Sequence, residues 1–213
     1  MTRARLGFVL AASFGAALSS AVPARAGGLG IAVEVGLRSL SNSADTEKAI
    51  FDSRSGVGLG LGLFYGRGER WRFGLDVRHI GRDGERAFAA DRTSPAFHLG
   101  HPLNFTMNQG VVSAAYLFGK IGPVSPYLAI GGGLVSWKER SDIAGLIERA
   151  AGTSPLFEGR VGFERQQGWL RLGLEGGITF VPNAIGVGGI SQVYEESDLG
   201  GVFVVAKMGF SRR

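Results

Sequence analysis

Eleven charged side chains are the residues of this chain best placed for chemistry, because they recur at alternating positions within apolar stretches. In the stretch from Trp71 to Arg78, apolar residues alternate with glycine and charged residues. Alternate residues of a β-strand share one face, so each stretch predicts a strand with a charged face and an apolar face. The eleven are five carboxylates and six bases, here called the lumen charges: Glu34, Arg38, Arg72, Asp76, Arg78, Glu158, Arg160, Glu164, Arg171, Glu175 and Lys207.

The elements that must position these charges are eight strands, predicted at 28–39, 55–65, 70–80, 107–118, 126–137, 156–166, 169–180 and 201–210. Their lengths match the roughly 9–11 residues with which a tilted strand crosses a bilayer. The connections 66–69, 119–125 and 167–168 are short, and 40–54, 81–106, 138–155 and 181–200 are long. The pattern predicts an all-β fold, an eight-stranded antiparallel up-and-down transmembrane β-barrel with short periplasmic turns and long extracellular loops.

Inside a barrel of eight strands there is room only for side chains, so the lumen charges must pair with one another. Within this ladder we expect Arg160 to pair with Glu158, and Arg171 with Glu175. The ladder would plug the lumen as a structural feature. As an alternative, an exchange of partners would open a narrow path for ions.

Aromatic residues gather near the ends of the predicted strands, where amphipathic rings favour the two lipid–water interfaces. We therefore predict an aromatic girdle formed by Tyr65, Trp71, Tyr116, Tyr127, Trp169, Phe210, Trp137 and Phe180.

The first 26 residues read as a secretory signal peptide, with Arg3 and Arg5 before a short apolar core and small residues around a cleavage site. Residues 27–213 would then form one domain. The whole chain carries a net charge of +5, and the three arginines of the leader leave +2 for the rest. This near-neutral balance, without a basic run, argues against nucleic acid as a partner. The chain has no cysteine and therefore no disulfide.

Two local stretches resemble the small outer-membrane barrels of the OmpA transmembrane-domain, OmpX and opacity-protein kind. The first is the Pro-Tyr-then-glycine run from Pro123 to Gly133, and the second runs from Ser197 to Gly201 and on to Phe210. The resemblance implies a monomer in the bacterial outer membrane, in contact with lipid and lipopolysaccharide. It also implies insertion by the barrel-assembly machinery, which reads a C-terminal aromatic; here Ser211, Arg212 and Arg213 follow Phe210.

The three histidines give no complete catalytic or metal site. His98 and His101 lie three apart in a predicted loop, but structural zinc takes four ligands. His79 falls on the lipid-facing phase of its strand, as in some lipid A-modifying barrels, where a serine follows the histidine by two positions. That position is Gly81 here. We expect no catalytic residue, no cofactor and no metal, and therefore no enzyme.

One further element is predicted, a short amphipathic helix from Ser141 to Ala151 that caps the barrel mouth. The function favoured is that of a surface scaffold, in adhesion or envelope integrity, whose long loops contact a surface ligand. A small-solute or ion transporter with a narrow gated pore is the alternative. A lipid A-modifying enzyme is a third.

Overall fold

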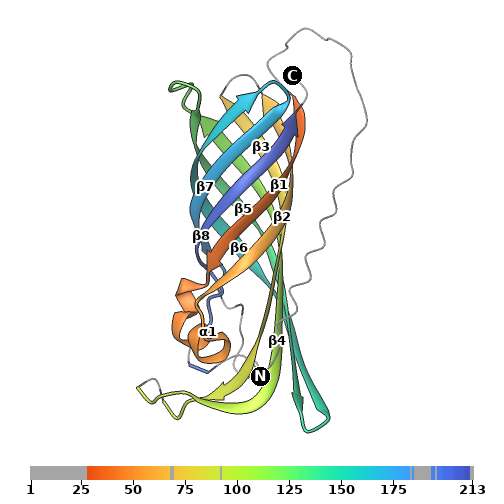
Figure 1. The fold of residues 1–213 in the computed structure, drawn as a ribbon, viewed down its shortest axis with the longest axis vertical. Helices are drawn as coiled ribbons and strands as arrows, with labels where there is room; N and C mark the ends of the chain where they lie inside the picture. The colour runs from red at the N-terminus through yellow and green to blue at the C-terminus, as the bar shows by residue number, and fades with distance from the viewer. Residues whose placement is uncertain are drawn as a thin grey trace, which may run out of the picture.

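The computed structural model describes residues 28–67, 70–91, 93–182, 184, 193–194 and 196–211. The signal peptide predicted for residues 1–26 lies outside these residues. Eight antiparallel strands form one closed barrel in chain order (Figure 1), which confirms the predicted fold. The strands are β1 Leu29–Ser39, β2 Ser55–Arg67, β3 Trp71–Phe88, β4 Phe97–Leu117, β5 Ser125–Ile143, β6 Leu146–Gln167, β7 Leu170–Phe180 and β8 Gly201–Ser211.

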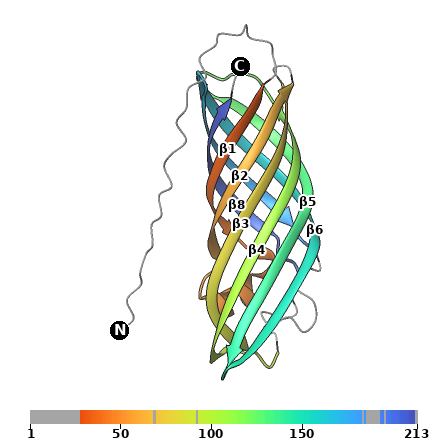
Figure 2. The same ribbon diagram turned by 90° about the vertical axis from the view of Figure 1, so that its right-hand side faces the viewer.

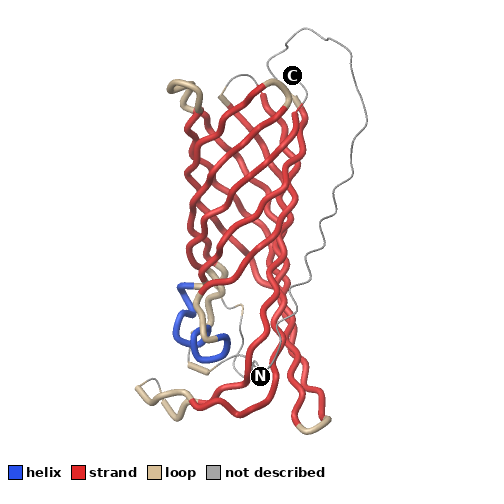
Figure 3. Tube along the Cα trace, viewed as in Figure 1, coloured by secondary structure: helices blue, strands red, loops and turns tan. Residues whose placement is uncertain are grey.

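The registers between neighbouring strands determine the width and tilt of the barrel. A path followed from Leu29 through all eight registers returns to β1 at Ser39, ten residues further along, which is the shear of the barrel. Eight strands with this shear tilt by about 40° and enclose an interior that side chains fill. The strands lean accordingly around the barrel axis (Figure 3).

Strands β3 to β6 extend well past the other four at the end with the long connections (Figures 1 and 2). Pairing between β3 and β4 continues to Phe88 and Phe97, through a bulge near Glu85. The predicted loops 81–106 and 138–155 are therefore mostly strand, and this part of the prediction was wrong. The polar, periodic sequence beyond the apolar belt was interpreted as loop, although a β-hairpin needs no lipid around it.

The helix predicted from Ser141 to Ala151 was also wrong, because this segment forms the tip of the β5–β6 hairpin. Ile143 pairs with Leu146 across a two-residue turn. Both turn residues have positive φ, 51° at Ala144 and 89° at Gly145. Such turns match the twist of a hairpin, and cross-strand pairing along the whole length stabilises the arms. The apolar residues that suggested a helical stripe instead lie on two strands, Ile143 on β5 and Leu146, Ile147 and Ala150 on β6.

A short helix, α1 (Ala44–Phe51), follows the 3₁₀ turn η1 (Ser41–Ser43) in the first long connection. It lies at the long-connection end of the barrel (Figure 1). Ile50 is buried, and the ring of Phe51 lies 6.2 Å from that of Phe105. The sequence analysis did not predict this helix. Among the described residues, no helix is long and apolar enough to cross a membrane.

The two faces of the barrel wall differ in polarity, and the difference reverses along the longest strands. In the half nearer the short turns, large apolar side chains such as Leu61, Leu75 and Ile130 are exposed on the outside, while charged residues point inward. In the other half of β4, the buried inward residues are apolar, as at Phe105 and Met107. The outward residues there are polar.

Candidate functional site

The charged interior of the barrel rests on an unusual pair of strands, β2 and β3. Every second residue of β2 from 56 to 62 is glycine, and the register sets these glycines beside the inward residues of β3. A Cβ at Gly60 would lie 3.0 Å from Cγ of Arg78, and one at Gly62 would lie 2.6 Å from a carboxylate oxygen of Asp76. These four inward positions, which have no side chain, thus provide the space that the charged side chains of β3 occupy.

Arg78 is the centre of the resulting ion-pair network. Its Nε lies 2.9 Å from Glu34, its Nη1 2.8 Å from Glu158 and its Nη2 3.5 Å from Asp76. Glu34 also forms an ion pair with Lys207, whose Nζ lies 2.7 Å from the carboxylate. All these charges except the half-buried Lys207 are buried. Several carboxylates around one guanidinium satisfy its fork of donors and keep each buried charge paired.

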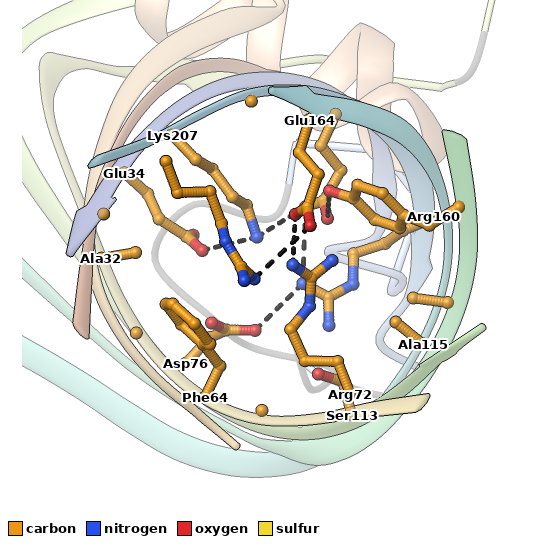
Figure 4. A pocket seen from close by; sticks show the side chains of 18 residues that line it. Ala32, Glu34, Phe64, Arg72, Asp76, Ser113, Ala115, Arg160, Glu164 and Lys207 are labelled. Atoms are coloured by element: carbon orange, nitrogen blue, oxygen red, sulfur yellow. Dashed lines mark hydrogen bonds and ion pairs between the residues drawn. The ribbon is translucent and has the colours of Figure 1, made fainter. Parts of the chain in front are cut away.

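Arg160 forms a second centre on β6. Its guanidinium lies 3.1 Å from Glu158, 3.0 Å from Asp76 and 3.4 Å from Glu175. The predicted pair of Arg160 with Glu158 is therefore present. Glu175 is shared with Lys207, at 3.1 Å, so the carboxylates bridge the bases into one network across the lumen (Figure 4).

Nearer the short turns, the prediction that pairs Arg171 with Glu175 was wrong. Arg171 lies 3.5 Å from Glu164, which also binds Arg72. Four residues along one strand span about 13 Å, too far for an ion pair, whereas Glu164 lies on the adjacent strand β6. Around these charges is a cavity of about 60 Å³. Because about 10–15 Å³ already holds one water molecule, there is room for a few waters.

Above the network, toward the long connections, the interior changes to an apolar layer. This layer was not predicted, because only charged residues were assigned to the inward positions. The signal was present in β4 from Leu103 to Met107, where the inward residues are apolar and the outward ones are polar. The buried members are Leu40, Ile80, Phe105, Met107, Val111, Val135, Trp137, Leu156, Val181, Ala184 and Leu199. The layer is not wholly apolar, because the registers set the buried polar residues Gln109 and Ser154 beside Val135.

The sequence matches no protein-family model and no curated protein. Among solved structures, Neisserial surface protein A matches with 15% identity and a TM-score of 0.51, covering 86% of this chain and 95% of that chain. The attachment invasion locus protein Ail of Yersinia pestis matches with 11% identity and a TM-score of 0.47, covering 87% and 97%. The first match and the closed ring of strands decide the fold. This chain has the fold of the small eight-stranded outer-membrane barrels.

In this barrel fold, six of the eight predicted girdle residues face outward. Trp71 and Tyr116 meet edge to face with centroids 5.2 Å apart, and Trp169 stacks on Phe210 at 5.1 Å. The other two on the outside are Tyr65 and Phe180.

Two girdle assignments were wrong, because Tyr127 and Trp137 point into the barrel. Tyr127 donates a hydrogen bond to Glu175 at 2.8 Å, and Trp137 belongs to the apolar layer. The prediction used their positions near strand ends and ignored the parity of β5, whose outward residues are Leu128, Ile130 and Leu134.

The histidines lie outside the barrel lumen. The Nδ1 of His79 lies 2.8 Å from Oδ1 of Asn108, on the neighbouring strand. His98 lies 3.6 Å from Glu85 and 3.9 Å from Asp52. Within the described ranges, no cluster of three or more acidic or histidine residues is arranged to hold a metal ion.

Replacing Gly60 by valine tests the role of the glycine strand. A Cβ there meets Arg78, the carbonyl oxygen of Val77 and Glu34 at 3.0 to 3.2 Å, so we expect a loss of about 1–3 kcal/mol from overpacking. Gly110→Val is the matched control, since an added Cβ at this outward glycine meets nothing within 4 Å. Urea unfolding in lipid vesicles measures the free energy of unfolding of both variants. If the two variants are equally stable, the glycines of β2 do not provide the space for the charged side chains.

Replacing Arg78 by methionine tests the network itself. The change leaves Glu34, Asp76 and Glu158 short of a partner, and removing one member of a buried ion pair costs about 3–5 kcal/mol. Arg86→Met breaks a more exposed pair with Glu148 and should cost at most about 1 kcal/mol. The same unfolding measurement applies, and a smaller loss for Arg78→Met than for Arg86→Met would contradict the central position of Arg78.

Helix α1 should dock more tightly at low pH. Glu47 is buried beside Arg82, Glu139 and Glu196, and its burial raises the pKa to about 7 from an ordinary 4.5. A raised carboxyl pKa means that the docked state holds the proton more strongly, so docking weakens as the pH rises from 4.5 through 7. Hydrogen exchange in α1, corrected for intrinsic rates, should show more protection at pH 5 than at pH 8. In Glu47→Gln that difference should disappear; protection that is independent of pH in the unmodified chain would refute the coupling.

Proposed function

We propose that this protein is an integral protein of the bacterial outer membrane whose closed barrel anchors two rigid hairpins at the cell surface. The apolar residues exposed around the outside of all eight strands support lipid as the surroundings of the barrel. The aromatic pairs near the short turns suit an interface between lipid and water. On this proposal the short turns face the periplasm, and β3–β4 and β5–β6 extend outward.

The observation that carries the scaffold role is the closed interior. Buried ion pairs fill the middle of the lumen, and the apolar layer lies above them. An ion passing this mostly apolar level would lose most of its hydration, which costs several kcal/mol. This argues against the alternative of a gated solute or ion transporter. A barrel with a filled interior is a rigid support.

The ends of the two hairpins carry features suited to contact with a surface ligand. Large apolar side chains are exposed there, beyond the apolar belt of the barrel: Phe88, Phe97, Leu99, Leu146 and Ile147. Exposed apolar groups outside lipid favour binding to another surface. We propose adhesion or envelope contact through these hairpin ends. Outer-membrane lipid, lipopolysaccharide and the barrel-assembly machinery are the other partners proposed, and the barrel acts as a monomer.

The proposal includes no catalytic role. His79 and Asn108 form a hydrogen-bonded pair on the outside, but position 81, two residues after the histidine, is glycine and offers no nucleophile.

Because the chain has no cysteine, single cysteines test the orientation directly. Leu146, at the hairpin tip, is 74% exposed, and Ile121, in the β4–β5 turn, is 68% exposed. A membrane-impermeant maleimide should label Leu146→Cys on intact cells and Ile121→Cys only after lysis. The reverse pattern would overturn the orientation. If both cysteine variants are labelled equally and are recovered in the soluble fraction, the proposed membrane location is overturned.

Current recordings in planar lipid bilayers distinguish the scaffold proposal from the transporter alternative. The purified barrel should give no steady single-channel current. Reproducible openings that disappear in an Arg78 variant would replace the scaffold proposal by a gated pore.

A further inference from the structure

Three exposed bases lie on the outside of the β5–β6 hairpin, where it extends past the barrel (Figure 2). They are Lys138 and Arg140 on β5 and Arg149 on β6, here named the outer basic patch. Their outward phase follows from β5, where the alternating residues Trp137 and Glu139 are buried. The register sets Arg140 directly opposite Arg149, and Lys138 lies two residues from Arg140 on the same face. Three positive charges therefore meet on one small area of the outer wall.

Neighbouring carboxylates do not neutralise the outer basic patch. Within the described ranges, none of its bases lies within 4 Å of a carboxylate. Asp142 instead accepts a hydrogen bond from a backbone N–H of the hairpin turn at 2.9 Å. Asp83 lies two strands from Arg140, about 10 Å away, and accepts a hydrogen bond from Asn104. Like charges directly opposite in a strand pair are destabilising, so Arg140 and Arg149 weaken the hairpin unless an anion lies between them.

The patch begins just above the level where the apolar belt ends. On β5 the outward residues pass from Leu134, which is 60% exposed, through Ser136 to Lys138. At a strand tilt of about 40°, Lys138 lies about 10 Å above Leu134. Polar headgroups occupy roughly 5–8 Å beyond the hydrocarbon of a bilayer, and long basic side chains bend toward them. With the barrel in the outer membrane, as proposed, the patch lies at the headgroups of the outer leaflet.

The chemistry of the hairpin differs between the patch and the tip. The tip exposes the apolar residues Leu146 and Ile147. A soluble polyanion that approached from outside would meet these residues first, whereas lipid headgroups surround the wall of the barrel and meet the patch from the side. Charge and position together favour an anion carried by a lipid.

We propose that the outer basic patch binds the phosphate groups of lipid A, the phosphorylated glycolipid of the outer leaflet. A guanidinium binds a phosphate through two parallel N–H donors, and a lysine adds a compact charge. Arg140 and Arg149 hold one phosphate between them, which removes their mutual repulsion, and Lys138 contacts the headgroup from nearer the belt. The inference rests on the proposed outer-membrane location and assigns residues to the lipopolysaccharide contact.

Native mass spectrometry of the folded barrel in detergent micelles tests the proposal. The fraction of barrels that retain diphosphoryl lipid A is measured as the lipid is titrated, and lipid A from which the phosphates have been removed is the reference. The phosphorylated lipid should bind about tenfold more tightly, because three exposed charge contacts together supply about that factor. Equal affinity for the two lipids would overturn the proposal.

Two triple variants assign the affinity to the patch. Lys138→Gln/Arg140→Gln/Arg149→Gln should bind the phosphorylated lipid about tenfold more weakly than the unmodified barrel. The matched control removes three exposed bases at the short-turn end and should keep the full affinity; it is Arg67→Gln/Lys120→Gln/Arg165→Gln. A loss in the control alone would place the lipid at the short turns and refute this site. Inorganic phosphate at the same concentration should leave the lipid bound, and displacement would refute a lipid site.

The single variant Arg149→Gln keeps the proposal testable if the triple variant does not fold. It removes the repulsion from Arg140, so without lipid it should be at least as stable as the unmodified barrel, and its affinity for phosphorylated lipid A should fall severalfold. Unchanged affinity would contradict the site. If the cysteine labels confirm the orientation while the affinity is unchanged, only this inference fails; a barrel recovered in the soluble fraction would overturn the proposed location as well.

Discussion

The narrow interior is the constraint on which the rest of this structure depends. An eight-stranded barrel has space for one layer of side chains across its lumen, so long charged residues on one strand require their neighbour to leave room. Strand β2 does so with glycine at 56, 58, 60 and 62. Glycine weakens a strand, and the cost is offset because Arg78 then reaches Glu34 on β1 and Glu158 on β6 as well as Asp76 on its own strand. The interaction around Arg78 therefore depends on the four inward positions of β2 that have no side chain.

From this constraint the interior acquires an order along the barrel axis. Near the short turns a polar cavity has room for water. The ion pairs follow, where each carboxylate is shared between bases and no single pair moves without disturbing the others. The apolar layer comes last and separates the charges from the long connections. A lumen that was wet throughout would let the ion pairs exchange partners with water, and the apolar layer removes that freedom. The members of this layer on β3 to β6 belong to the same strands that continue outward as hairpins.

The sequence predicted the number of strands, their antiparallel order and the inward phase of the charged residues, because a period of two over ten residues is a strong signal. It did not predict which charges meet. Arg171 pairs with Glu164 through the register of two strands, and register depends on the whole ring. It also missed the true lengths of β3 to β6, since the polar hairpin arms lack the apolar row by which a membrane strand is recognised. Tyr127 and Trp137 were misplaced because end position was weighed above strand parity.

In strand β4, the face that carries the apolar residues changes from the outside to the inside along its length. From Val112 to Tyr116 the outward residues belong to the apolar belt, and the inward ones are small or polar. From Leu103 to Met107 the buried inward residues are apolar and the outward ones polar. With the barrel in the outer membrane, as proposed, the backbone pattern is unchanged along β4 but the medium outside changes. A strand in lipid keeps its polar residues inside, and a strand in water keeps its apolar residues inside. The reversal falls between the two, beside the paired His79 and Asn108. We infer that this level marks the outer edge of the lipid, and that the hairpins beyond it are a water-exposed β-structure continuous with the membrane barrel.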